Sequence, residues 1–373
     1  MFDELLATPE SQHWQWDLAL QMRKAVEHVY ATDPDEVQSV EAMVRAASGR
    51  AAVALPGSPG TKVEVESAFL HGPRSQVEFE VGGEHHQCEL ADLLVLGSLA
   101  QDEKLVGQRV CFIQAKRASK AGAQSPSRYG IDPWQLALLR AFPEFTGVSG
   151  VFEAQSLHLR NRTGMLGAYG LLSEPGEFSI VSARIVDSVL GGRRSVAAKE
   201  FIPAFLAPAP NWRVQNPTVF SRYPWPFLDP ERCQLCADIL RHLWRPAWLH
   251  SHSHHSHSVK AGVKAREDSH VWDPTVLSCI GMDTFVEAWT ALRLGELWRP
   301  GTAVQSDMRL GACILAVVSR AKGQLSGLNG LLAEAHVGSP SKRDSESRPE
   351  VRGNSGGLAI LSAIARTSRT IPE

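Results

Sequence analysis

Two short apolar runs, each carrying charged or polar side chains, constrain the fold of this chain most. The first run covers residues 87–96 and contains Asp92, and the second covers residues 109–116 and ends in Gln114-Ala115-Lys116. Leu, Val, Ile and Phe dominate both runs, a composition typical of buried strands. Because an unpaired charge in a buried strand is costly, we expect Asp92 and Lys116 to lie on neighbouring strands, where they pair with each other or hold a metal ion.

The order of patterns along the chain predicts an α/β fold. Residues 12–48 carry apolar side chains at helical spacing, interrupted by Asp33-Pro34-Asp35, which predicts a helix start. Strand-like runs follow over residues 61–70, 76–81, 87–96 and 109–116, and Asp132-Pro133 predicts the start of another helix. This order predicts a central mixed sheet flanked by helices, followed by a second, mixed α+β region.

The length of 373 residues predicts two domains. We expect the first over residues 1–200 and an accessory domain over residues 201–373. The accessory region contains a His-rich loop (250–268), an amphipathic pattern that predicts a helix over residues 284–298, and a linker (339–357) rich in Ser, Arg, Glu and Gly. A short apolar segment, residues 358–364, follows the linker.

Composition excludes several classes of protein. A formal net charge of -2 excludes a chain that binds nucleic acid through its overall charge. The chain has no apolar run long enough for a membrane span and its first residues lack the pattern of a signal peptide, so we expect a cytoplasmic protein that does not contact membranes. Six scattered cysteines do not form a secreted disulfide framework. Cys233 and Cys236 have zinc-knuckle spacing, but one such pair supplies only half of a structural zinc site.

A candidate site for metal-assisted chemistry follows from the two runs. Residues two apart in a strand share a face, so Gln114 and Lys116 project together. With Asp92 on the adjacent strand, a carboxylate and an amide oxygen converge, and such oxygen ligands suit Mg²⁺ or Mn²⁺. Because a neutral Gln binds these ions less well than Glu, we expect another acid, either Glu66 or Glu41.

Two further expectations depend on regular strand geometry. Glu89 precedes Asp92 by three residues, so a regular strand would direct its side chain to the opposite face, and we rank it last as the extra acid. The long separation between Asp92 and Gln114 predicts a sizeable hairpin loop between their strands.

The helix, the strands, Asp92, the Gln114-Ala115-Lys116 tripeptide and the helix from Asp132 together resemble the PD-(D/E)XK nuclease superfamily, in its version with Gln-x-Lys. The resemblance covers residues 36–145, although no Pro precedes Asp92. It implies a restriction-endonuclease-like core, metal binding by Asp92 and Gln114, activation of water by Lys116, and hydrolysis of DNA. Nucleases of this kind are common in bacterial defence against phages, so the resemblance also implies an antiviral role.

A basic segment next to the candidate site favours DNA as the substrate. Residues 104–131 contain no acid, and we expect Arg117, Lys120 and Arg128 to contact phosphates. The second half of the chain would bind a protein partner or a second copy of the chain. The alternative is a catalytically silent scaffold that binds nucleic acid or a protein, in which Asp92 caps a turn and Lys116 extends its stem along the strand end. Gln114 favours this alternative.

Overall fold

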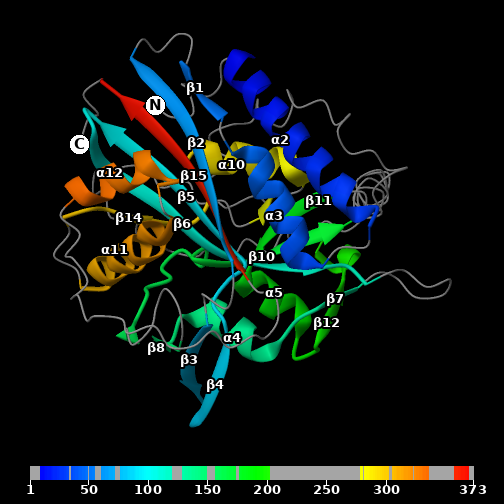
Figure 1. Cartoon of the computed structure of the whole chain (residues 1–373). Helices are drawn as coiled ribbons and strands as arrows, with labels where there is room; N and C mark the ends of the chain where they lie inside the picture. The colour runs from blue at the N-terminus through cyan, green and yellow to red at the C-terminus, as the bar shows by residue number, and fades with distance from the viewer. Residues whose placement is uncertain are drawn as a thin grey trace, which may run out of the picture.

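The computed structural model describes residues 9–32, 35–48, 50–54, 60–71, 76–119, 128–148, 156–173, 176–201, 278–279, 281–301, 305–321, 323–335 and 357–368. Within these residues, nine strands form one mixed sheet, and helices cover both of its faces (Figure 1). The predicted α/β class is therefore confirmed. None of the helices in these ranges is both long enough and apolar enough to cross a membrane.

The large sheet combines parallel and antiparallel neighbours. Its strands lie in the order β1 (Arg50–Ala54), β2 (Thr61–His71), β15 (Gly357–Thr367), β5 (Leu93–Gln101), β6 (Lys104–Arg117), β10 (Gly167–Ser173), β11 (Glu177–Ser182) and β13 (Ser278–Cys279). A further strand, β14 (Glu296–Trp298), pairs with the first half of β6. The parallel pairs are β15 with β5 and β6 with β10, and the other pairs are antiparallel.

Helices bury the apolar side chains of both sheet faces. The helices on one face are α2 (Pro9–Tyr30), α3 (Glu36–Ala47) and α10 (Gly281–Thr290). Those on the other face are α4 (Pro133–Ala141), α5 (Ala183–Leu190), α11 (Gln305–Val318) and α12 (Ser326–Glu334). Leu93 and Val95 of β5 pack into the first layer, and Leu94 and Leu96 into the second. Burial on both faces explains why this strand reads as a continuous apolar run.

Two smaller sheets extend the structure beyond the large one. The four-stranded sheet has the order β4 (Glu84–Glu89), β3 (Gln76–Val81), β8 (Phe145–Gly147) and β9 (Ser156–Leu157). The other is a two-stranded ribbon of β12 (Ser195–Ala197) and β7 (Arg128–Gly130), followed by the short 3₁₀ helix η2 (Ala198–Phe201). Another 3₁₀ turn, η5 (Ser319–Ala321), ends α11.

The predicted helix starts are present. Asp35 caps α3 through a hydrogen bond from the backbone N–H of Gln38 to its side chain, and the Gln38 side chain accepts from the Asp35 N–H. This reciprocal pair is a capping box. Asp132 caps α4, and Pro133 is its first residue. Both helices border the candidate site.

The structure corrects two predicted elements. The run over residues 87–96 is not one strand, because β4 ends at Glu89 in the small sheet and β5 begins at Leu93 in the large one. The helix predicted over residues 284–298 ends at Thr290, and residues 296–298 form β14 instead. Leu292 adopts a positive φ of 57°, a conformation that ends a right-handed helix.

No long loop separates Asp92 from Gln114, contrary to the prediction. β5 and β6 are long strands, joined by a two-residue turn of Asp102 and Glu103 with φ values of 46° and 64°. Positive φ at both positions is the geometry that matches the twist of a tight hairpin. The residues between Asp92 and Gln114 therefore lie mainly in the two paired strands.

The two halves of the chain share one sheet. Strands β13, β14 and β15 come from the region expected to form a separate domain, yet all three belong to the large sheet. Strand β15 even lies between β2 and β5. The boundary expected at residue 200 therefore does not separate two sheets. The predicted His-rich loop, Cys233 and Cys236 lie outside the described residues, as does the linker up to residue 356.

Candidate active site

The backbone of Asp92 is held between two strands. It lies immediately before β5, whose first residue, Leu93, pairs with Ile113 of β6. The Asp92 N–H donates to the Ile113 carbonyl at 3.1 Å, and the Asp92 carbonyl accepts from the Ala359 N–H of β15 at 2.8 Å. The residue is 3% exposed, so its carboxyl group is fixed within the protein interior.

The Asp92 side chain begins a chain of hydrogen bonds that reaches helix α4. Its Oδ2 accepts from the Ala115 N–H at 2.8 Å and from Nε2 of Gln114. Oε1 of Gln114 accepts from Nε2 of Gln135 at 2.5 Å. Gln135 is in the first turn of α4, where Asp132 accepts a hydrogen bond from its backbone N–H at 2.9 Å. A carboxyl and two amides thus connect β5, β6 and α4, and the structure brings Asp92 and Gln114 together.

The environment of Asp92 opposes its ionisation. Burial, the largest cause, and the negative charge of Glu89 raise the pKa of Asp92 to about 8. The positive charge of Lys116 and the hydrogen bond from Ala115 act in the opposite direction, and the charge of Glu36 adds a smaller increase. The charges of one ammonium and two other carboxylates therefore act on Asp92. Without a compensating cation, it is mainly protonated at neutral pH.

Glu89 is the acid that most raises the pKa of Asp92, although alternation along one regular strand predicts that its side chain lies on the opposite face. The alternation argument fails because the chain passes from one sheet to the other between Glu89 and Leu93. Glu36 is a further acid at the site that the sequence does not indicate. As the first residue of α3, it accepts a hydrogen bond from the Arg117 N–H at 3.3 Å. The cap at Asp35 predicts an acid in the first turn, but not that this turn meets the end of β6.

The structure does not bring the two expected extra acids to Asp92. Oε1 and Oε2 of Glu66 accept hydrogen bonds from the N–H groups of Gly327 and Leu328 at 2.8 and 3.0 Å. Glu66 thereby satisfies the N-terminus of α12, which has no side-chain cap of its own. Glu41 forms an ion pair with Arg45 one turn further along α3.

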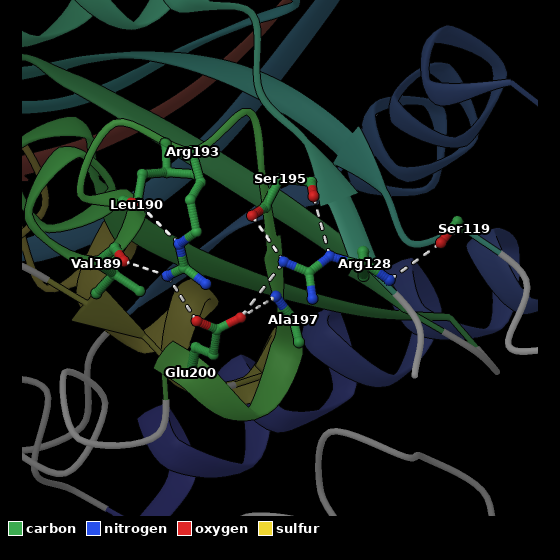
Figure 2. Close-up of polar contacts among 8 residues, drawn as sticks. All are labelled: Ser119, Arg128, Val189, Leu190, Arg193, Ser195, Ala197 and Glu200. Carbon is green, nitrogen blue, oxygen red and sulfur yellow. Dashed lines mark hydrogen bonds and ion pairs between the residues drawn. The ribbon is translucent and has the colours of Figure 1, made fainter. Parts of the chain in front are cut away.

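The predicted phosphate-binding residues have internal contacts. The Arg117 guanidinium lies 4.9 Å from the centre of the Tyr30 ring. Arg128 donates to Oγ and the carbonyl oxygen of Ser195 at 2.9 and 2.8 Å and lies 3.6 Å from Glu200 (Figure 2). These hydrogen bonds link β7 to β12. Lys120 lies outside the described residues.

Glu200 is shared by two arginines, Arg128 of β7 and Arg193, which precedes β12. Its carboxylate pairs with Arg193 at 2.7 Å as well as with Arg128, and it accepts the Ala197 N–H at 2.9 Å (Figure 2). The hydrogen bonds from Ala197 and Arg193 lower the pKa of Glu200. A phosphate contact by Arg128 would therefore have to compete with a carboxylate already in place.

Asp92 and Gln114 carry the kinds of oxygen atom that a divalent cation takes as ligands. The hydrogen bonds that Asp92 accepts from Gln114 and Ala115 both end on Oδ2, and the negative charge of Glu89 acts on the same carboxyl group. Gln114 turns its NH₂ toward Asp92 and its oxygen toward Gln135, so the amide must rotate before that oxygen can face a cation. In the described part of the chain, no three His, Cys, Asp or Glu side chains are already arranged to hold a metal ion.

Comparison of the chain with protein-family models, with curated proteins and with solved structures finds no match.

Proposed function

We propose that this chain is a metal-dependent nuclease that hydrolyses DNA phosphodiester bonds, with Asp92, Gln114 and Lys116 in its active site. The observation that carries the proposal is the buried Asp92 carboxyl, whose pKa is raised to about 8 beside Glu89 and Lys116. A buried acid next to a second acid costs free energy, and a bound cation would offset that cost. Perturbed acids of this kind are concentrated at catalytic and metal sites.

The order of elements also supports the proposal. Asp92 precedes β5, Gln114 and Lys116 are near the end of the antiparallel strand β6, and α4 then leads toward the parallel strand β10. The resemblance to PD-(D/E)XK nucleases requires this order of Asp, Gln-x-Lys and helix.

Each residue has a distinct proposed role. Asp92, Gln114 and Glu89 would hold Mg²⁺ or Mn²⁺, which takes oxygen ligands. When bound, such an ion stabilises negative charge on the phosphate and makes a water more acidic. The ammonium of Lys116 would hold the attacking water and offset charge that develops on the phosphate. Gln135 fixes the Gln114 side chain through their hydrogen bond.

The wider setting of the proposal follows from the resemblance and from charge. We propose a cytoplasmic effector in bacterial defence, controlled by a protein partner or by a second copy of the chain. A net charge of -2 supports low resting affinity for DNA, because neutralising phosphates requires an excess of Lys and Arg. Arg117, Lys120 and Arg128 would contact the backbone once DNA is bound.

Cleavage of supercoiled plasmid with Mn²⁺ or Mg²⁺ tests the proposal. Wild-type protein should nick the plasmid, and Asp92→Ala and Lys116→Ala should each reduce the rate by a factor on the order of a hundred or more. Lys104→Ala is the matched control, because Lys104 is an exposed lysine on the same strand as Lys116. Activity that survives both site substitutions would place the chemistry elsewhere.

One observation favours the alternative of a catalytically silent scaffold. The hydrogen bonds among Asp92, Gln114 and Gln135 form a continuous buried network that already uses the Gln114 oxygen. A scaffold needs no metal, so its thermal unfolding should not respond to Mn²⁺. The nuclease proposal instead requires Mn²⁺ to raise the Tm of wild-type protein and Asp92→Ala to remove that increase.

A further inference from the structure

A row of three aromatic rings leads from the core to the surface and ends on helix α4, which also carries Gln135. Phe79 of β3 is buried at 3% exposure, and its ring centre lies 6.0 Å from that of His86 on β4. The His86 ring lies 3.5 Å from the Trp134 ring at an interplanar angle of 15°. Trp134 is the outermost ring and is 40% exposed. Because the imidazole covers one face of the indole, the exposed area belongs to its other face and its edges.

The outermost ring belongs to the residue that directly precedes Gln135, a member of the active-site hydrogen-bond network. Trp134 is in the first turn of α4, and Oδ1 of Asp132 accepts its backbone N–H at 2.9 Å. The next residue, Gln135, contacts Gln114 directly. The position of the indole is thus fixed by a capped helix end and by the His86 ring.

The chemistry of this surface suits a nucleobase better than a phosphate. A flat, exposed aromatic face binds bases by stacking, with little dependence on sequence. Asp132 places a carboxylate on the same helix turn, and this negative charge disfavours a phosphate there. A base paired within a duplex is already stacked on both sides, so only an unpaired or extruded base can reach a side chain of this kind.

We propose that Trp134 receives an unpaired nucleobase of the substrate, and that the substrate is therefore single-stranded or locally unpaired DNA. This inference rests on the proposed nuclease function and specifies the substrate of the same site. The indole would hold one base while the adjoining backbone extends toward Lys116.

Binding of a short single-stranded oligonucleotide that carries a fluorescent base analogue tests this inference without cleavage. In metal-free buffer, the full-length protein should quench the analogue, and Trp134→Ala should weaken binding about tenfold and remove the quenching. Trp134→Phe keeps a stacking ring, so it should retain most of the binding affinity and most of the quenching. His86→Ala, which removes the supporting ring, should give an intermediate loss.

Trp16→Ala is the matched control. Trp16 is 37% exposed and also lies next to a histidine, His13, but it is on α2, on the opposite face of the large sheet. The Trp16→Ala variant should bind the oligonucleotide as the wild type does. A duplex of the same sequence should bind more weakly than the single strand, and its binding should not depend on Trp134.

The outcomes separate this inference from the proposed function. Equal binding by Trp134→Ala and wild-type protein, or no binding by the wild type, would overturn the stacking role even if plasmid cleavage is observed. Binding that depends on Trp134, in a protein that cleaves no DNA with any metal, would support the base site and overturn the nuclease.

Discussion

The backbone N–H of Ala359 donates a hydrogen bond to the carbonyl oxygen of Asp92 at 2.8 Å. This contact joins β15 to the residue at the centre of the candidate site. Strand β15 also pairs with β2 and β5 along its length, and most of its side chains are buried. A strand from the far part of the sequence therefore helps to position Asp92.

Deletion of residues 357–373 should abolish cooperative folding. Without β15, strands β2 and β5 lose their common neighbour, and each exposes an unpaired edge that favours aggregation. Expression in the soluble fraction and thermal unfolding followed by circular dichroism would measure the effect. Deletion of residues 369–373, which follow β15, should leave both unchanged. A wild-type Tm in the longer deletion would contradict the central role of this strand.

Asp92→Asn should change how stability depends on pH. The folded protein holds the Asp92 proton more tightly than the unfolded chain, because its pKa is raised from 3.8 to about 8. The free energy of unfolding therefore falls as pH rises between these values and is constant, for this group, above about 8. Asn has no charge to desolvate, so wild-type protein should lose at least about 1 kcal/mol relative to Asp92→Asn across this window.

The difference between the two proteins is the quantity to measure, because Glu177 and Asp283 also have raised pKa values and add the same trend to both. Denaturant titrations at pH values across this window, without divalent ions, would measure the difference in the free energy of unfolding between the two proteins. A constant difference would mean that Asp92 ionises as freely in the folded protein as in the unfolded chain.

Glu89→Gln should weaken metal-dependent activity and lower the pKa of Asp92. Glu89 is the strongest acidic neighbour of Asp92, so its loss removes a negative charge and, under the proposed function, a metal ligand. We expect the concentration of Mn²⁺ for half-maximal cleavage to rise by about 10–100-fold. Glu78→Gln, an exposed acid on the neighbouring strand β3, is the control and should behave as the wild type. Equal behaviour of the two variants would remove Glu89 from the site.

Glu66→Gln should reduce stability without reducing cleavage. Its carboxylate accepts two backbone N–H groups at the start of α12, and the loss of such a charged cap costs about 0.5–2 kcal/mol. Glu64→Gln on the same strand removes an ion pair with Arg366 and should cost less. Denaturant unfolding would rank the two variants. A loss of cleavage in folded Glu66→Gln protein would restore Glu66 as the extra acid.

Local patterns in the sequence were sufficient to predict several elements. Burial on both faces gives β5 and β6 their continuous apolar runs, and Asp132 with Pro133 determines where α4 begins. The same patterns correctly predict that Asp92 and Gln114 lie side by side. The partner of a strand is not a local property, so the apolar character of residues 358–364 indicates burial but not a place between β2 and β5.

The error at Glu89 has a specific cause. Leu90 and Ala91 are buried at 1% and 0% exposure, so the hydrophobic pattern continues through the point where the chain changes sheets. No Gly or Pro marks this change. A period of two cannot detect such a break, so it cannot place Glu89 relative to Asp92.

The strands of the large sheet are synthesised in an order that determines when the candidate site is complete. On the ribosome, β5 and β6 are made long before β15, which lies between β5 and β2 in the finished sheet. Until β15 arrives, the carbonyl of Asp92 lacks its donor from Ala359. A nascent chain that already contains Asp92, Gln114 and Lys116 therefore lacks a finished site. Under the proposed function, a nascent chain without β15 would not yet cleave DNA.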